Sequence, residues 1–197
     1  MVPLKYPIIL ASNSRARNDM LKNAGLNFTK IPADIDEDAV IKGATASPKS
    51  LALELAQQKA LHISAQNSGA YVIGSDQILE CEGALFQKAN NADEARAKLK
   101  TLRGKTHHLH ASVAIALNGE IIWHDTDTAK MAMHNFTDEF LETYLATAKD
   151  DITCCVGAYA FESHGAWLFD TIDANYFTIL GMPLLPLLAF LNSGDNQ

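Results

Sequence analysis

Two arginines stand where the sequence predicts the start of a helix. An apolar run at residues 8–10 ends in a polar turn with Ser12 and Ser14, and Arg15 and Arg17 follow at once. Free N–H groups at a helix N-terminus carry partial positive charge, so an acidic residue suits that position and an arginine does not. Serine hydroxyls, free N–H groups and a guanidinium at one helix start are, however, suited to binding an anion.

Arg17 is the arginine that we expect to face inward. It lies one turn before the apolar residues Met20 and Leu21, so its side chain should follow the buried face of the helix. The alternative is an ordinary capped helix on which Arg15 and Arg17 are both solvated. The chain contains neither GxxxxGK(S/T) nor GxGxxG, which excludes a P-loop or Rossmann-type phosphate site.

Lys59 lies in an otherwise apolar row of a predicted helix. Leu51, Leu55, Lys59 and Ile63 are spaced four residues apart, so they share one face, and three of the four are apolar. That face should meet the core, where an ammonium is costly unless it reaches solvent or meets an anion. Either alternative is open from the sequence.

Two groups of carboxylates complete the candidate chemistry. Asp76 directly follows residues 70–75, which read as a strand buried on both faces, and an acidic segment occupies residues 34–38. Asp76 suits a turn cap, a metal ligand or a general base. The acidic segment reads as a solvated loop, although one of its carboxylates could share a divalent cation with Asp76. Magnesium prefers one or two carboxylates together with water and substrate phosphates.

Taken together, the cations and carboxylates form the set of groups that a triphosphate and its metal require. Cations would hold the phosphate charge, and carboxylates would hold the metal and orient a water molecule. All of them lie near the ends of predicted elements.

Composition narrows the class of protein. The chain has 197 residues, of which 48% are hydrophobic and 20% are charged, and these values predict one globular domain. The net charge of −7 argues against non-specific binding to nucleic acid or to an anionic membrane. A local basic pocket for a small anion remains compatible with that charge.

The three cysteines predict neither a disulfide framework nor a zinc site. Their number is odd, and Cys154 and Cys155 are adjacent. We expect these two in a core strand rather than as a redox pair, because adjacent cysteines have poor disulfide geometry. This usage fits a reducing cytoplasm. We expect no signal peptide, because the apolar part of the first residues is too short, and no membrane span, because the apolar run at 179–191 is interrupted by glycine and proline.

Predicted strands and helices alternate early in the chain, and predicted hairpins follow later. This order favours an α/β domain with a mixed sheet, whose elements must position these residues. Residues 34–39 read as a loop, and hairpin turns are expected at Glu82-Gly83 and Asn118-Gly119. Strands are predicted at 6–12, 27–32 and 70–75, strand and turn at 157–173, and helices at 14–24, 48–66, 92–102, from Thr137 to about 148, and after Pro183.

Eight short motifs occur in an order that resembles the Maf family, whose members are nucleoside triphosphate pyrophosphatases. They cover the chain from about residue 8 to residue 191. The motifs are Ser12-Asn13-Ser14-Arg15-Ala16-Arg17, Asp34-Ile35-Asp36-Glu37, Leu55-Ala56-Gln57-Gln58-Lys59-Ala60, Gly74-Ser75-Asp76-Gln77, Lys88-Ala89, Leu102-Arg103-Gly104-Lys105-Thr106-His107, Gly157-Ala158-Tyr159 and Gly181-Met182-Pro183-Leu184.

The resemblance implies one Maf-like α/β domain over residues 1–197. It would be elongated, with two lobes around a curved mixed sheet, helices flanking the sheet and a central cleft, similar to the inosine triphosphatase fold. It also implies the reaction: cleavage of a nucleoside triphosphate to the monophosphate and pyrophosphate, with water attacking the α-phosphorus and a divalent cation, Mg²⁺ or Mn²⁺, assisting.

The resemblance also assigns roles to individual residues. Asp76 would accept the proton or hold the metal with Glu37, and Lys59 and Lys88 would complete the catalytic set. The substrate-binding residues would be Ser12, Ser14, Arg17, Gln77 and Glu162. We expect no nucleic-acid or membrane partner and a cytoplasmic location, and the resemblance allows a homodimer.

Departures from the family pattern refine these expectations. Only Arg17 keeps the position of an arginine in the first motif, which leaves Arg15 as a surface charge. Gln77 replaces the usual threonine and Ala89 the usual proline. Glu162 stands where many members carry glutamine, which argues against a preference for dTTP or UTP. A carboxylate accepts hydrogen bonds from exocyclic amino groups or ring N–H groups, as on cytosine or guanine.

Two other functions remain open from the sequence. One is a nucleotide-binding regulatory protein with little catalysis, because the family is associated with cell division and septum formation. The other is a phosphomonoesterase, which would release orthophosphate. The complete set of acids and lysines favours the pyrophosphatase.

Overall fold

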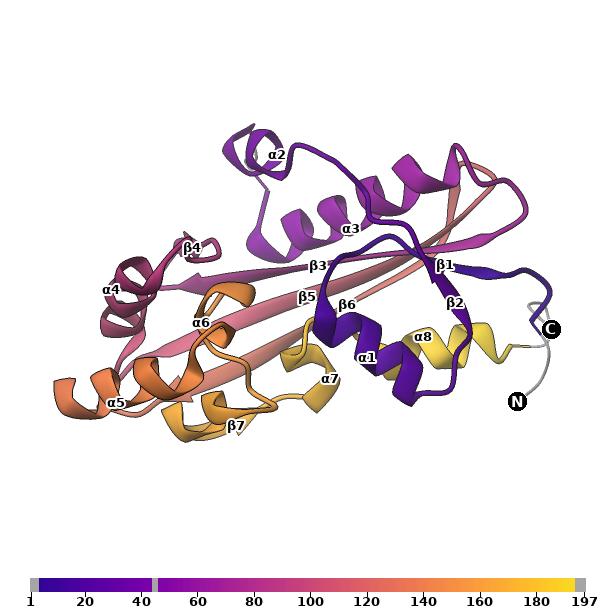
Figure 1. Ribbon diagram of the computed structural model, residues 1–197. Coiled ribbons are helices and arrows are strands. Elements are labelled where there is room, and N and C mark those ends of the chain that lie inside the picture. Colours follow the sequence, from indigo (N-terminus) through magenta and orange to yellow (C-terminus); the bar gives the residue numbers. More distant parts are fainter. Residues whose placement is uncertain (1–3, 44–45, 194–197) are drawn as a thin grey trace.

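The computed structural model describes residues 4–43 and 46–193, and the ends of the predicted 1–197 domain lie outside them. Helices and strands alternate in its first half, and long hairpin strands follow (Figure 1). The strands are β1 Ile8–Leu10, β2 Phe28–Lys30, β3 Tyr71–Cys81, β4 Ala84–Phe86, β5 Thr106–Leu117, β6 Glu120–Met133 and β7 Phe169–Asp173. The helices are α1 Arg15–Asn23, α2 Glu37–Gly43, α3 Pro48–Ser64, α4 Ala92–Leu102, α5 Asp138–Ala148, α6 Asp151–Cys154, α7 Tyr176–Ile179 and α8 Leu184–Leu191, with a 3₁₀ turn, η1, at His164–Leu168.

Within the described residues, the strands form one seven-stranded sheet in the order β2-β1-β3-β5-β6-β7, and β4 pairs with β3. β1 runs parallel to both β2 and β3, and the other pairs are antiparallel. β3, β5 and β6 are 11, 12 and 14 residues long and extend along most of the molecule (Figure 1). The predicted α/β class with a mixed sheet flanked by helices is therefore confirmed.

The two faces of the sheet are covered by different helices. Odd-numbered β3 residues such as Ile73 pack with Leu10 and Leu187 in a core shared with α1 and α8. Even-numbered residues such as Val72 pack with Ala56 in a core shared with α3. This division follows from the two-residue period of a strand, and Figure 1 shows α3 and the α1–α8 pair on opposite sides of the sheet. The face on which a β3 side chain lies therefore decides which helix it meets.

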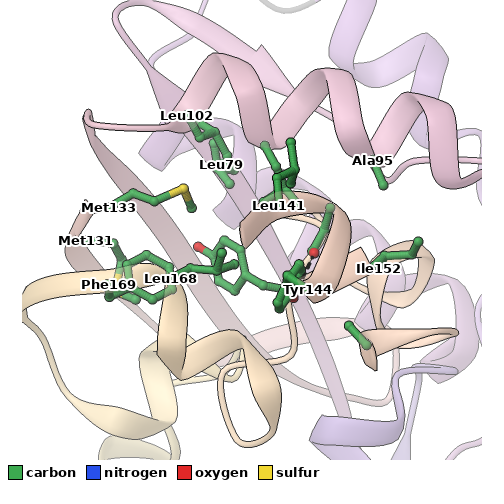
Figure 2. Close-up of a cluster of buried hydrophobic side chains, with 14 of the residues drawn as sticks. Leu79, Ala95, Leu102, Met131, Met133, Leu141, Tyr144, Ile152, Leu168 and Phe169 are labelled. Carbon is green, nitrogen blue, oxygen red and sulfur yellow. Dashed lines mark hydrogen bonds between the residues drawn. The ribbon is translucent and has the colours of Figure 1, made fainter. Parts of the chain in front are cut away.

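Apart from the cores on the two faces of the sheet near α3 and α1, a separate hydrophobic core covers the far ends of the long strands (Figure 2). It is called the second core below. Leu79 and Met131 from the sheet pack there against Leu102 of α4, Leu141 of α5 and Phe169 of β7. Its members are buried, so this core anchors the segments between β3 and β5 and after β6.

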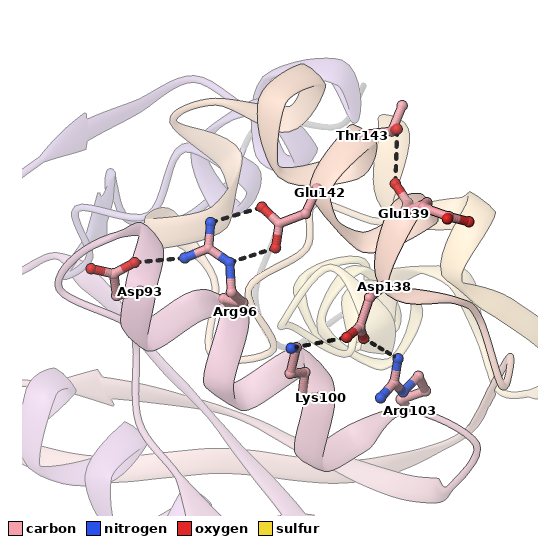
Figure 3. A network of polar contacts seen from close by, with 8 residues as sticks. All are labelled: Asp93, Arg96, Lys100, Arg103, Asp138, Glu139, Glu142 and Thr143. Carbon is pink, nitrogen blue, oxygen red and sulfur yellow. Dashed lines mark hydrogen bonds and ion pairs between the residues drawn. The ribbon is translucent and has the colours of Figure 1, made fainter.

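An exposed ion-pair network joins α4 to α5 at the surface of that second core (Figure 3). The Arg96 guanidinium donates to both carboxylate oxygens of Glu142, at 2.7 and 2.9 Å, and to Asp93 on its own helix. Asp138 accepts from Lys100 and Arg103 in the same way. Such exposed pairs contribute little to stability.

Local sequence signals predicted several element boundaries correctly. Ser47, Asn91 and Thr137 each accept a backbone N–H at the start of a predicted helix, as expected of N-caps, and Ser14, predicted as the first helical residue, is an N-cap as well. The predicted hairpin turn at Asn118 has a positive φ of 53°, and β5 and β6 flank it. Among the described helices, none is long and apolar enough to cross a lipid bilayer.

Three expectations are wrong. The acidic segment is not entirely a loop, because α2 begins at Glu37 and Asp36 accepts the Ala39 N–H at its start. The strand predicted at 70–75 continues to Cys81, because β5 pairs with it as far as Glu80, including Asp76 opposite Ser112, and β4 pairs with its last three residues.

The cysteine pair is the third correction. Cys154 is exposed and ends the short helix α6, and Cys155 is partly exposed, so neither lies in a core strand. No sequence pattern indicated α7, a single helical turn before Gly181.

Gly74 lets α3 approach the sheet closely, and this generates a stability prediction. A Cβ at residue 74 would lie 2.1 Å from the Ala56 carbonyl oxygen and 2.6 Å from the Ala60 nitrogen, both backbone atoms of α3. Gly74→Ala should therefore push α3 outward and lower the free energy of unfolding by at least about 1–3 kcal/mol, as measured in urea.

Gly43→Ala is the matched control, because nothing lies within 4 Å of the place that an added methyl group would occupy at the end of α2. It should leave the unfolding free energy unchanged or slightly higher. Equal stability of the two variants would contradict the close approach of α3 at Gly74.

Candidate functional site

The polar turn before α1 places its serines and an arginine in one small network. Ser14 is the N-cap of α1, and Ser12 Oγ accepts from the Ser14 N–H at 3.1 Å and from Arg17 Nη1 at 3.3 Å. Arg17 Nε donates to the Gly181 carbonyl at 3.0 Å. The start of the chain is thereby joined to the segment between α7 and α8.

Arg15 and Arg17 have opposite environments, as the helical spacing predicts. The Arg15 side chain is 90% exposed and pairs with Asp19 of its own helix, at 3.7 Å. Arg17 is buried, and this burial lowers its pKa, although the negative charges of Asp76 and Glu37 act in the other direction. The guanidinium stays charged, because its ordinary pKa is far above neutral pH.

Lys59 meets two carboxylates instead of reaching solvent. The row that includes Leu55 and Ile63 is buried, and Lys59 itself is 7% exposed. Its Nζ lies 2.5 Å from Asp76 Oδ1 and 2.7 Å from Glu37 Oε1. The buried ammonium therefore holds α3, β3 and the start of α2 together, and snorkelling is not the explanation for this residue.

Asp76 is a buried carboxylate inside a strand. Its even position in β3 points it toward α3 and Lys59, and the continuation of the strand excludes the turn-cap alternative. Burial raises the pKa of Asp76, while the charges of Lys59 and Arg17 act to lower it. A carboxyl with a raised pKa, held beside two cations, is a candidate proton acceptor.

The neighbours of Asp76 in β3 point to the other face of the sheet. Gln77 Nε2 donates to the carbonyls of Thr178 at 2.9 Å and Ile179 at 3.1 Å. Ser75 Oγ lies 3.0 Å from the carbonyl of Gly181, the same oxygen that Arg17 binds. The Gln77 amide nitrogen is thus engaged by α7, and its binding of substrate stays a prediction.

Sequence reasoning missed the support that α7 gives to this region. Asp127 of β6 accepts from Thr178 Oγ1 at 2.6 Å, which fixes α7 against the sheet. Gly181 has a φ of 102°, which favours glycine, and its carbonyl receives Arg17. The one available signal was Gly181 in the last of the eight motifs, which by itself says nothing of a carbonyl acceptor.

A cavity of about 510 Å³ brings all the predicted site residues together. Cys154, Cys155 and Tyr159, which the sequence did not assign to a site, line the same cavity. The predicted residues that line it are Ser12, Ser14, Arg17, Glu37, Lys59, Asp76, Gln77, Lys88 and Glu162.

Lys88 and Glu162 are exposed, as is Glu37, but they differ from Glu37 in having no ion-pair partner among the described residues. They lie after β4 and after the Gly157–Tyr159 segment, on walls of the cavity that the second core supports. Neither forms a hydrogen bond or ion pair with any residue in the part of the chain that the structure describes. Both side chains are therefore available to a ligand, and the roles predicted for them remain predictions.

The contrast between the two arginines generates a binding prediction. Arg17→Ala should weaken binding of inorganic triphosphate at least tenfold in calorimetry, because a hydrogen bond to a charged group contributes about 1.5–3 kcal/mol. Arg15→Ala, which removes the same charge from an exposed position on the same helix, should change the affinity less than twofold.

Thermal unfolding of both variants is the necessary control, because Arg17 also binds the Gly181 carbonyl. Arg17→Lys separates charge from geometry, since lysine keeps the charge and lacks the planar fork. Similar losses in Arg15→Ala and Arg17→Ala would show that the inward arginine is not the phosphate ligand.

Two solved structures are distantly similar. A HAM1 protein from Coxiella burnetii matches 66% of this chain and 74% of its own, at 18% identity and a TM-score of 0.46. A nucleoside-triphosphatase, dITP/XTP pyrophosphatase, from Mycobacterium abscessus covers the same shares at 14% identity and a TM-score of 0.40. Neither score is high enough to carry an inference about this chain.

Sequence relatives are much closer. A protein of Nitrobacter hamburgensis named nucleoside triphosphate pyrophosphatase is 46% identical over 188 residues, 95% of this chain and 93% of its own. A protein of Bartonella henselae named 7-methyl-GTP pyrophosphatase is 46% identical over 186 residues, 94% of each chain. The model of the Maf-like protein family matches residues 7–194. The chain therefore belongs to the Maf-like protein family.

Proposed function

We propose that this protein is a nucleoside triphosphate pyrophosphatase, which hydrolyses a nucleoside triphosphate to the monophosphate and pyrophosphate. The observation that carries the proposal is the buried Lys59 ammonium between Asp76 and Glu37, in one cavity with the buried Arg17. The cavity volume of about 510 Å³ is suitable for a nucleotide-sized ligand. The printed names of the relatives, including the one from Nitrobacter hamburgensis, support the same reaction.

Asp76 is the proton acceptor in the proposed reaction. The oxygen of a water molecule forms a bond to the α-phosphorus, and the bond from that phosphorus to the bridging oxygen of the β-phosphate breaks. Pyrophosphate leaves with the bonding electron pair, and Asp76 takes the proton from the water. Burial favours this role, because the raised pKa brings the carboxyl closer to the working pH.

The cations in the cavity hold the triphosphate and the charge that develops on it. Arg17 and Lys59 are fixed by Gly181 and by the two carboxylates, so they are already oriented before a ligand arrives. Ser12 and Ser14 add hydroxyl and backbone donors at the start of α1. Lys88 is exposed and unpaired among the described residues, which suits a role in meeting the leaving phosphates.

The carboxylates fit a shared divalent cation. Asp76 Oδ1 and Glu37 Oε1 already converge on one ammonium, so they are placed to share one positive charge. The described residues contain no group of three or more His, Cys, Asp or Glu side chains that could hold a metal. Because Asp76 and Glu37 supply two carboxylates, the remaining ligands of Mg²⁺ or Mn²⁺ would be substrate phosphates and water, as magnesium prefers. When bound, the cation would neutralise phosphate charge and lower the pKa of the attacking water.

Glu162 is proposed to select the base. Its carboxylate is exposed in the cavity wall beside Phe161, which supplies an aromatic surface for stacking. A carboxylate accepts from the amino and ring N–H groups of guanine and cannot donate to a carbonyl. A guanine-type or methylated guanine base fits this chemistry better than thymine, and the printed name of the Bartonella henselae relative points the same way.

The decisive experiment is a nucleotide panel that includes methylated bases, scored separately for pyrophosphate and orthophosphate with Mg²⁺ or Mn²⁺. Asp76→Asn should lower kcat by about 10²–10⁴-fold, because it removes the proton acceptor and keeps the shape of the side chain. Glu37→Gln should also lower kcat strongly and raise the metal concentration that gives half-maximal rate.

Asp38→Asn is the matched control for Glu37→Gln. Asp38 is the next residue of α2 and accepts from Gln87 rather than from Lys59, so its loss should change the rate only severalfold. Orthophosphate as the product would identify a phosphomonoesterase instead. Nucleotide binding without turnover would favour the regulatory protein, and undiminished turnover of Asp76→Asn would contradict the role of Asp76.

The base selection is tested by Glu162→Gln. Glutamine can both donate and accept, so kcat/KM for pyrimidine nucleotides with carbonyl groups should rise relative to that for guanine nucleotides. We expect a change in the ratio of about tenfold, the size of one lost or gained hydrogen bond. An unchanged ratio across the panel would remove Glu162 from base selection while leaving the reaction itself untouched.

A further inference from the structure

Two adjacent thiols stand in the wall of the cavity without a part in the proposed reaction. Cys154 ends α6 and Cys155 follows it, and their sulfur atoms lie 3.4 Å apart. Both residues line the cavity, Cys154 is exposed and Cys155 is partly exposed. A small reagent that enters the cavity can therefore reach this pair.

The two thiols are chemically unequal. A hydrogen bond from the Cys155 thiol lowers the pKa of Cys154 to about 7, against the opposing effects of burial and of the Asp151 and Glu162 charges. The pKa of Cys155 is raised, first by that same hydrogen bond and then by burial. Because the thiolate is the reactive form, Cys154 is the nucleophile of the pair and Cys155 is placed to attack whatever forms on it.

Cys81 provides an internal comparison. It is buried in the second core, and burial raises the pKa of its thiol. Its sulfur donates to the Thr106 carbonyl, and Cys81 does not line the cavity of about 510 Å³ that Cys154 and Cys155 line. We therefore expect Cys81 to be unreactive in the folded protein.

We propose that Cys154 and Cys155 are an oxidative modification site in the cavity wall, where a hydroperoxide oxidises Cys154 and Cys155 then closes a vicinal disulfide. The Cys154 thiolate attacks one peroxide oxygen, the O–O bond breaks, and a sulfenic acid and hydroxide form. The Cys155 sulfur then attacks the Cys154 sulfur and displaces the hydroxyl as water. In sum, two thiols are oxidised to one disulfide, and hydrogen peroxide is reduced to two water molecules.

The disulfide would be strained and easily reversed. Consecutive Cα atoms across a trans peptide lie about 3.8 Å apart, whereas disulfides usually join Cα atoms about 4.4–6.8 Å apart. A strained disulfide has a more oxidising potential, so a dithiol reductant opens it readily. The pair is thus suited to a reversible modification rather than to a structural cross-link.

The structure also indicates how formation of the disulfide would affect the rest of the cavity. Lys98 Nζ donates to the Val156 carbonyl at 2.9 Å and to the Gln87 carbonyl, so it joins the segment after Cys155 to the segment that carries Lys88. A rearranged backbone at the cysteine pair would therefore displace two walls at once.

The segment that follows has little freedom to absorb this change. Ala158 has a positive φ of 59°, and its carbonyl accepts from Tyr144 Oη at 3.2 Å. The Tyr159 ring lies so close to Gly157 that a Cβ there would be 2.2 Å from it. We expect oxidation to weaken nucleotide binding severalfold, a consequence that rests on the proposed function.

Intact and peptide mass spectrometry after mild treatment with hydrogen peroxide tests the proposal without any activity measurement. The wild-type protein should become two hydrogen atoms lighter, with the change on the Cys154–Cys155 peptide, and dithiothreitol should restore it. Cys81 should remain free and become alkylated only after unfolding. In Cys155→Ser, dimedone should instead trap a sulfenic acid on Cys154.

Several outcomes would overturn the proposal. They are alkylation of Cys154 and Cys155 at unchanged levels after peroxide, oxidation at Cys81 first, or absence of a dimedone adduct on Cys154 in Cys155→Ser. The hydrolysis rate of treated protein, divided by that of the same protein untreated, gives the functional readout. The ratio should fall for the wild type and stay near one for Cys154→Ser. If the proposed function is wrong, there is no hydrolysis rate to compare, but the mass spectrometry still tests the oxidation of the cysteines.

Discussion

A single buried ammonium sets the geometry on which the cavity depends. Taking a lysine charge out of water is expensive, and Lys59 is stabilised only because Asp76 and Glu37 are both within reach of its Nζ. Three elements that are separate in the sequence must dock together to supply those partners. A buried ion pair of this kind adds little net stability compared with an apolar core, so its value lies in the fixed charges that it places in the cavity.

The strand that carries Asp76 divides its polar residues between the two faces of the sheet. Asp76 turns toward α3 and Lys59, whereas Ser75 and Gln77 turn toward the segment around α7. The cations are also supplied from both faces, because Arg17 comes from α1. Because successive side chains of β3 point to opposite faces, residues that line the cavity are held by both hydrophobic cores of the sheet. A shift of β3 by one residue would exchange the two sets of partners.

The features that could be predicted from the sequence are those with local causes. The inward position of Lys59 follows from the apolar row of α3, that of Arg17 follows from its spacing to Met20 and Leu21, and the Asn118-Gly119 turn follows from backbone preference.

The features that were missed depend on pairing between segments that are distant in the sequence. β3 extends past Asp76 because β5 pairs with it as far as Glu80 and β4 pairs with its last residues. α7 is held by Asp127 and Gln77. No local pattern marked Cys154 and Cys155 as cavity residues, since their position follows from the packing of α6. For the site, the residues that the order of the motifs selected line one cavity in the structure, although they come from separate parts of the chain.

The hydrogen bond from Arg17 to the Gly181 carbonyl has a consequence for folding during synthesis on the ribosome. Synthesis proceeds from the N-terminus, so Arg17 emerges long before its partner. Until residue 181 has left the exit tunnel, the inward guanidinium lacks that acceptor, and α8 is not yet packed on the face of β3 that it shares with α1. The arrangement around Arg17 is therefore completed only after residue 181 has been synthesised, and a nascent chain stalled before that point would lack the Arg17–Gly181 contact.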